Sequence, residues 1–250
     1  MYRELQVADL ELPRTAVCEN PLEVFAMKAL IFDSGTLINL SMNGLLDILE
    51  RLKKNFDGKF LITREVKYEV IDRPIGIYRF ELGAIRVQNL IDSGVLELPS
   101  AIGISDELIK KETEALMETA NHSVQVDGRW VDIVNNGEIS CLALSRELSE
   151  RKIENMIAID ERTTRVLSEN PESMERMMSE KIHRRVHVDE EKLKTFSEFR
   201  FIRSSEIVYV AYKRGLTNVE GKKALEALLY ATRFKGAAIS FEEIDILKKL

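Results

Sequence analysis

Short apolar runs alternate with longer periodic segments in the first third of the chain. The apolar runs are ALIF at 29–32 and FLI at 60–62, and each is followed by a segment whose apolar residues recur at helical spacing. A brief, wholly apolar run is typical of a strand that is buried on both faces of a sheet. Strands that alternate with helices in this way form βαβ units. We therefore predict an α/β fold with a mainly parallel sheet.

The rest of the chain continues this alternation. A short strand, VLEL, is expected after Gly94, which ends a helix. A charged amphipathic helix is expected over 105–120, and a helix with a buried apolar stripe is expected after Asn135-Asn136-Gly137. Further strands are predicted at NMIAI and FRFI, and further helices at 162–169, IVYVAYKRGL, KKALEALLYATRF and FEEIDILKKL.

The predicted domain organisation is one α/β domain with additions. Residues 1–27 show no clean periodicity and contain two prolines, so we expect an N-terminal extension that packs as an arm. The domain then covers 28–250. Helical insertions are predicted near 105–135 and 171–197, and the second of these is charged and rich in Met and Glu, as in an exposed helix.

Composition excludes several classes. The 250 residues are 45% hydrophobic and 31% charged, which is globular. No stretch approaches the roughly 20 apolar residues of a membrane span, and the charged start lacks a secretory signal, so we expect a cytoplasmic protein without membrane association. Cys18 and Cys141 support neither a disulfide framework nor a zinc site, and we expect both to be inert. The net charge of -6 argues against a uniformly basic nucleic-acid surface, although 181–187 form a local basic strip.

Two aspartates follow predicted strands directly. Asp33 ends ALIF and Asp160 ends NMIAI. Ligands of open parallel sheets collect at the carboxyl ends of the strands, so both positions suit a functional site. The structural alternative is that each aspartate caps the helix that follows it, and the two readings are about equally balanced for either residue alone.

Two glutamates complete a possible acidic cluster. Glu138 lies at the beginning of the helix after Gly137, and Glu69 lies at the edge of an otherwise buried helix face. Oxygen ligands of this kind suit hard divalent cations, which also relieve the repulsion between carboxylates. The alternative, surface pairing with Lys or Arg, would have to apply to all four acids independently. The four acids therefore predict a site for Mg²⁺ or Mn²⁺.

Four motifs in order resemble those of the PIN-domain nucleases, in a prokaryotic subgroup related to toxin ribonucleases. They are Asp33-Ser-Gly-Thr-Leu-Ile, Val66-Lys-Tyr-Glu69-Val, Gly137-Glu138-Ile-Ser-Cys-Leu-Ala-Leu-Ser and Ile159-Asp160-Glu-Arg-Thr-Thr-Arg165, and the C-terminal segment is similar to the tail of one prokaryotic subgroup. The resemblance implies a three-layer α/β/α sandwich and a metal-dependent endoribonuclease. Related proteins often carry further acids where this chain has Ser140 and Glu161, so the number of metals stays open.

The resemblance also implies roles. Asp33 and Asp160 would be the principal metal ligands, Glu138 would share the metal, and Glu69 would bind it through water or orient the attacking water. Ser34 would hydrogen-bond a ligand carboxylate or the phosphate.

Several arginines are candidates for contacts with RNA. Arg162 and Arg165 would either pair with the acids or reach a phosphate, and Arg184 and Arg185 would either bind RNA phosphates or form a solvated face. His183 and His187 stand four residues apart, but the arginines between them disfavour a zinc site. Trp130 is expected to pack rather than to stack on a base.

The expected partner is RNA, single-stranded or structured, and an antitoxin-like protein and a homodimer are further possibilities. Residues 31–37 superficially resemble the haloacid-dehalogenase phosphatase motif, but Phe32 stands at the nucleophile and Ser34 at the second aspartate. The remaining alternative is a catalytically silent PIN fold that binds RNA or serves in assembly.

Overall fold

A four-stranded parallel sheet lies at the centre of the protein. In the computed structural model, which describes residues 28–249, the strand order is β2-β1-β5-β7. All three strand pairs are parallel, and β1 lies between β2 and β5 with Phe32 opposite Ala158. The strands are β1 (Ala29–Phe32), β2 (Lys59–Leu61), β5 (Asn155–Ala158) and β7 (Phe201–Ile202). The predicted parallel α/β sheet is confirmed.

The apolar runs form these strands because they are buried. All four residues of β1 and all four of β5 are buried, as expected for a sheet covered on both faces. The prediction of a strand at VLEL is wrong, because this segment forms no strand. Only Glu97 forms a bridge, to Leu61, so the sheet ends at β2 on that side apart from this contact.

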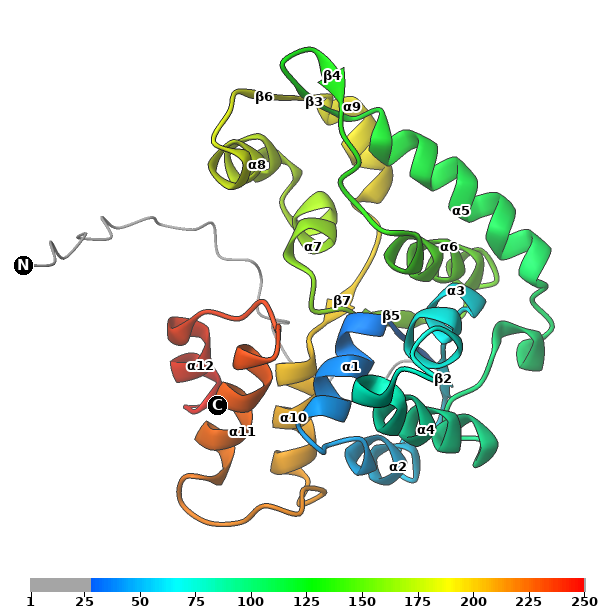
Figure 1. Cartoon of the computed structure of the whole chain (residues 1–250), viewed down its shortest axis with the longest axis vertical. Coiled ribbons are helices and arrows are strands. Elements are labelled where there is room, and N and C mark those ends of the chain that lie inside the picture. The colour runs from blue at the N-terminus through cyan, green and yellow to red at the C-terminus, as the bar shows by residue number, and fades with distance from the viewer. Residues whose placement is uncertain (1–27, 250) are drawn as a thin grey trace, which may run out of the picture.

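Helices lie on both sides of the sheet. Figure 1 shows α5 and α6 above the sheet and α1, α2, α4 and α10 below it in that view. The periodic segment that follows ALIF, at residues 37–54, forms two helices because Gly44 adopts a positive φ of 69°. The elements of this part are α1 (Ser34–Met42), α2 (Asp47–Lys53), α3 (Arg64–Lys67), the π-helix η2 (Tyr68–Asp72), α4 (Tyr78–Asp92), η3 (Pro99–Ile102), α5 (Asp106–Asn121), α6 (Asn136–Glu150) and α7 (Arg162–Glu169).

The two insertions pair with each other in a small antiparallel sheet, which the sequence did not predict. Its order is β4-β3-β6, and β3 (Val124–Val126) from the first insertion pairs with β6 (Val186–Val188) from the second. The wholly helical reading of 171–197 is therefore wrong. Val186 and Val188 are buried and His187 between them is exposed, which is strand periodicity. The other elements here are β4 (Arg129–Trp130), η4 (Pro171–Ser173), α8 (Met174–Ile182), α9 (Glu190–Leu193) and η5 (Lys194–Phe196).

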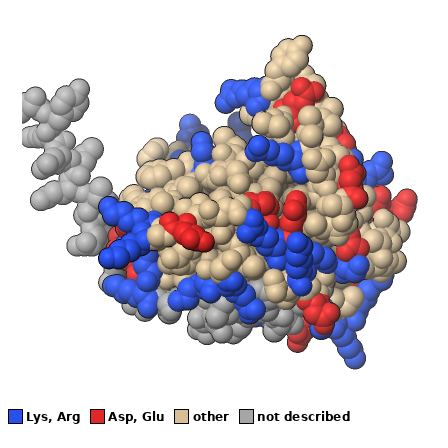
Figure 2. Space-filling view, turned by 90° about the horizontal axis from the view of Figure 1, so that it is seen from below, with Lys and Arg blue, Asp and Glu red and all other residues tan. Residues whose placement is uncertain are grey.

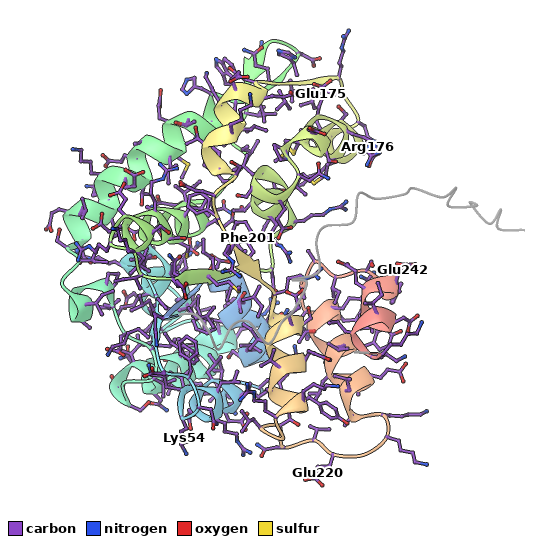
Figure 3. All side chains as sticks on the ribbon, turned by 180° about the vertical axis from the view of Figure 1, so that it is seen from behind. Lys54, Glu175, Arg176, Phe201, Glu220 and Glu242 are labelled. Carbon is purple, nitrogen blue, oxygen red and sulfur yellow. The ribbon has the colours of Figure 1, made fainter. Side chains whose placement is uncertain are left out.

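Three helices close the described chain: α10 (Ser204–Lys213), α11 (Ala224–Phe234) and α12 (Phe241–Leu247). A buried ion-pair network joins α10 and α12 to the sheet. Arg203, which follows β7, is fully buried and pairs with Glu206 of α10 and Glu243 of α12 at 2.8 Å each. Figure 3 shows Phe201 of β7 near the middle of the molecule, whereas Arg176 of α8 and Glu242 of α12 lie at its periphery.

Some predictions concern residues that lie outside the described range. The N-terminal arm at 1–27 and Cys18 belong to this group. Among residues 28–249, no helix is long and apolar enough to cross a membrane. On the face shown in Figure 2, Lys and Arg side chains are interspersed with Asp and Glu, as the mixed composition suggests.

Candidate functional site

The four parallel strands end at one edge of the sheet, and polar residues follow each strand there. Asp33 follows β1, Thr63 lies two residues after β2, Asp160 two residues after β5, and Ser204 two residues after β7. All four side chains are buried. The backbone N–H of Asp33 donates to the Ala158 carbonyl at 2.9 Å, so β1 and β5 stay paired up to the first aspartate. This edge is where ligands of parallel sheets collect.

Asp33 is both a helix cap and an incompletely satisfied carboxylate. Its Oδ2 accepts the Gly35 N–H at 2.9 Å at the beginning of α1, so the capping role is confirmed. Its Oδ1 is buried and has no hydrogen-bond partner among the described residues. Burial, together with the charges of Glu138 and Glu69, raises the pKa of Asp33 to about 7, although backbone hydrogen bonding at the beginning of α1 opposes the rise. An unsatisfied buried acceptor of this kind calls for an explanation, and a bound proton or cation would satisfy it.

Glu69 lies on an unusual turn of helix. The π-helix η2 follows α3 directly, and widened turns of this type occur frequently at functional sites. The Glu69 carboxylate lies against the first turn of α6, because a Cβ placed on Gly137 would be 2.6 Å from Glu69 Oε2. The glycine thus makes room for the carboxylate, and Glu69 is brought to the residue that precedes Glu138.

Glu138 lies in the first turn of α6 and is 7% exposed. It belongs to a capping box with Asn135, and its Oε2 accepts a hydrogen bond of 2.6 Å from the Thr164 hydroxyl of α7. Burial raises its pKa, Thr164 opposes that rise, and Glu161 adds to it. Glu138 therefore connects α6 to the helix that follows Asp160.

Asp160 is the most fully engaged of the four acids. Its Oδ1 accepts the Ser204 N–H at 2.8 Å, and its Oδ2 accepts the Ser204 hydroxyl at 2.7 Å and the Asn39 amide at 3.0 Å. Burial raises its pKa and these hydrogen bonds oppose the rise. Asp160 does not cap α7, because Glu161 does so through the Thr164 N–H. A carboxylate has about four acceptor sites, so Asp160 has little capacity left for a cation.

The other three acids have no cationic partner in the part of the chain that the structure describes. Within residues 28–249, Asp33, Glu69 and Glu138 form no ion pair and no hydrogen bond with Lys or Arg. Cys141 lies among them. Burial and the charges of Asp33, Glu69 and Glu138 hold the pKa of its thiol well above the usual value, which keeps the reactive thiolate rare.

The residue types at this site suit a hard divalent cation, but their present positions do not form a metal site. A cation would bind the unpartnered Oδ1 of Asp33 and would supply the positive charge that the acids lack. In the described part of the chain, however, no group of three or more His, Cys, Asp or Glu side chains forms a ready-made metal cage. The side chains would therefore have to move before they could share one ion.

The residues predicted to contact RNA differ in how accessible they are. Arg162 and Arg185 are exposed, and Ser34 is half-buried. Arg184 is exposed but pairs with Asp127 at 3.0 Å. Arg165 is 2% exposed and pairs with Glu169, so the prediction that it reaches a phosphate is not supported by its position. Its charge instead lowers the pKa of Asp160, which agrees with the ion-pairing alternative.

Sequence reasoning missed several residues that hold the acids in place. Thr164 donates to Glu138, and Ser204 and Asn39 donate to Asp160. Thr63 hydrogen-bonds Ser140 at 2.7 Å and so joins α3 to α6 beside Glu138. The available signal was local: Thr164 lies in the fourth motif, and Ser204 lies at a strand-to-helix turn. Their partners are far away in sequence.

The fold and the site together define an α/β protein that gathers carboxylates at the carboxyl edge of a four-stranded parallel sheet. Comparison with models of protein families, with curated proteins and with solved structures finds no match for this chain.

Proposed function

We propose that this chain is a PIN-like three-layer α/β/α nuclease that hydrolyses RNA phosphodiester bonds in the cytoplasm with the help of Mg²⁺ or Mn²⁺. The observation that carries the proposal is the buried, unpartnered Oδ1 of Asp33 beside two further uncompensated acids. Asp33 and Glu138 are buried, and Glu69 is half-buried beside them. Such carboxylates are costly to keep charged unless a cation or protons neutralise them. The four motifs in order support the same function.

The acids have different roles in this proposal. Asp33, Glu138 and Glu69 would hold the metal, which when bound activates water and polarises the phosphoryl oxygens. Asp33 is anchored through Oδ2, so its Oδ1 is the oxygen available to the ion. Thr164 orients Glu138, and Gly137 leaves space for Glu69. Asp160 keeps a share in the site through Oδ1 while Ser204 and Asn39 hold it in place.

The substrate contacts of the proposal come from exposed cations and hydroxyls. Ser34, in the first turn of α1, lies beside Asp33, and Arg162, in the first turn of α7, is within a turn of Thr164. Arg185 in the basic strip adds a third possible phosphate contact. An antitoxin-like partner and a homodimer stay predictions.

The direct test is cleavage of labelled single-stranded RNA in the presence of Mn²⁺, with and without EDTA. We expect cleavage by the parent, none in EDTA and none by Asp33→Asn. The matched control is Asp57→Asn, which removes a carboxylate that is 99% exposed and should leave the activity unchanged. RNA cleavage that persists in EDTA, or in a well-folded Asp33→Asn protein, would disprove the proposal.

The alternative function, a catalytically silent module that binds RNA or serves in assembly, has one observation in its favour. Asp33 and Glu138 already act as helix caps, which gives both acids a structural role without a metal. Intact RNA after incubation with Mn²⁺, together with RNA binding that EDTA does not affect, would favour this alternative.

A further inference from the structure

A groove opens on the surface beside Glu69. Its lining comes from α3, η2 and the beginning of α6, and consists of Arg64, Glu65, Tyr68, Glu69, Arg73 and Asn136. Two of these residues connect it to the acids. Glu69 lies against Gly137, and Asn136 is two residues from Glu138. A chain lying in this groove would therefore pass directly beside the candidate active site.

Tyr68 presents an aromatic ring to this groove. The residue is 58% exposed, although a ring of this size is normally largely buried or in contact with another group. Among residues 28–249, it makes no ring or cation contact. An exposed aromatic ring offers a stacking surface to a nucleic-acid base, and every base has a face that can use it.

Two arginines lie on either side of Tyr68 in the sequence and line the same groove. Arg64 is four residues before Tyr68, hence on the same helix face, and its only ion pair within residues 28–249 is a 3.7 Å contact with Asp106 at the surface. Such exposed pairs contribute little and leave the charge available. The Arg73 side chain is exposed and has no ion pair or hydrogen bond in the described range. Lys67 of α3, by contrast, is paired with Asp72 at 2.6 Å and does not line the groove.

We propose that this groove binds a single-stranded segment of RNA, with one base stacked on Tyr68 and backbone phosphates neutralised by Arg64 and Arg73. The proposal rests on the proposed function for the identity of the strand as the substrate. The strand is single because a base inside a duplex is already stacked and paired and has no free face for Tyr68. Arginine suits the phosphates because its planar fork can donate two hydrogen bonds to one phosphate group.

Binding is measured on metal-free protein in EDTA, so that cleavage does not interfere, as the fluorescence anisotropy of a short labelled oligouridine. Tyr68→Ala should weaken binding about tenfold, because stacking on one aromatic ring accounts for an effect of this size. Tyr68→Phe keeps the ring and should bind like the parent. The Arg64→Ala/Arg73→Ala double variant should reduce the slope of log affinity against log salt by about 1.4, since each phosphate contact to a single strand contributes about 0.7.

The control is Arg176→Ala, which removes an exposed arginine on α8, far from α3 in Figures 1 and 3. It should leave the binding and the salt slope unchanged. All the substituted groove side chains are exposed or at the rim of the fold, so thermal melts should match those of the parent. A base-paired duplex of the same length should bind more weakly than the single strand.

The outcomes separate this inference from the proposed function. If the parent cleaves RNA while Tyr68→Ala and the double variant bind as the parent does, the groove inference is wrong and the nuclease function stands. If the groove variants lose binding while the parent cleaves nothing with Mn²⁺, the groove inference stands and the nuclease function fails. Failure of the parent to bind the oligouridine, or equal binding of the duplex, also overturns the groove inference.

Discussion

Replacing Asp33 by Asn should make the metal-free protein more stable above neutral pH. The unfolded pKa of this carboxyl group is near 3.8 and the folded pKa is about 7. Between these values the folded state binds a proton that the unfolded state has lost, so the stability of the parent falls as the pH rises from about 4 to about 7. Above pH 7 the folded protein must bury the charge of Asp33, and the decrease in the free energy of unfolding reaches its full size.

The size of this effect follows from the two pKa values. The difference between about 7 and 3.8 is about three pH units, and each unit corresponds to 1.36 kcal/mol, so the charged Asp33 destabilises the fold by about 4 kcal/mol. Asn keeps the shape and caps helices about as well as Asp, so the cap at Gly35 should survive. For a chain of this length, 4 kcal/mol corresponds to about 10 °C in melting temperature.

The assay is a series of thermal melts in EDTA at pH values from 4 to 8, for the parent and for Asp33→Asn. The difference in melting temperature should be small near pH 4, increase up to pH 7 and then stay level. Taking the difference cancels the titration of groups that both proteins share. The same melts with excess Mg²⁺ or Mn²⁺ should stabilise the parent more than the variant, because ligand binding stabilises only where a site is intact.

The control is Asp57→Asn, in which the replaced carboxylate is almost fully exposed. It should show no such dependence on pH. If Asp33→Asn melts below the parent by the same amount at every pH, Asp33 acts as a cap whose charge is not costly, and the argument for an uncompensated acid fails.

Three further substitutions test the surroundings of the acids. Gly137→Ala should displace Glu69 and lower RNA cleavage at least tenfold, because the new Cβ would be 2.6 Å from its carboxylate. Thr164→Val should lower stability by about 1 to 3 kcal/mol in melts, and should shift the pH profile of cleavage upward, because Glu138 loses a hydrogen bond that holds its pKa down. Arg203→Met should destabilise the protein by about 3 to 5 kcal/mol in urea, because it removes the fully buried guanidinium that pairs with Glu206 and Glu243.

Matched controls exist for two of these. Gly83→Ala places a Cβ 3.1 Å from a serine hydroxyl, not from a carboxylate, and should preserve cleavage. Thr163→Val removes a hydroxyl from the same helix turn as Thr164 but not from Glu138, and should leave the pH profile in place. If Gly137→Ala cleaves RNA like the parent, the contact between Gly137 and Glu69 has no part in activity.

The sequence alone determined that the sheet is mainly parallel, and it placed most of the strands and helices along the chain. The apolar runs at ALIF and NMIAI became β1 and β5, and the helix over 162–169 has the predicted bounds. It also placed Asp33 and Asp160 at strand ends. These features depend on local periodicity and on turns between neighbouring segments, and both can be recognised in the sequence without knowing the fold.

Other features depended on contacts between segments that are distant in sequence. The strand β6 exists because β3, some 60 residues earlier, offers it an edge; its own three residues are too short to indicate a strand within a charged stretch. Arg165 resembled an exposed phosphate ligand, but the packing around α7 buries it beside Glu169. Periodicity alone does not reveal such burial, because neighbouring elements, not the helix itself, cover that face.

The state of each acid was likewise decided by the tertiary structure. Asp160 is held by Ser204 and Asn39, which are far apart in sequence, whereas one oxygen of Asp33 has no partner among the described residues. The two residues occupy equivalent positions in the sequence pattern, each after a buried strand. Their hydrogen-bond partners differ because those partners arrive through space from other elements, and only the packed arrangement of the elements decides which carboxylate is satisfied and which remains available.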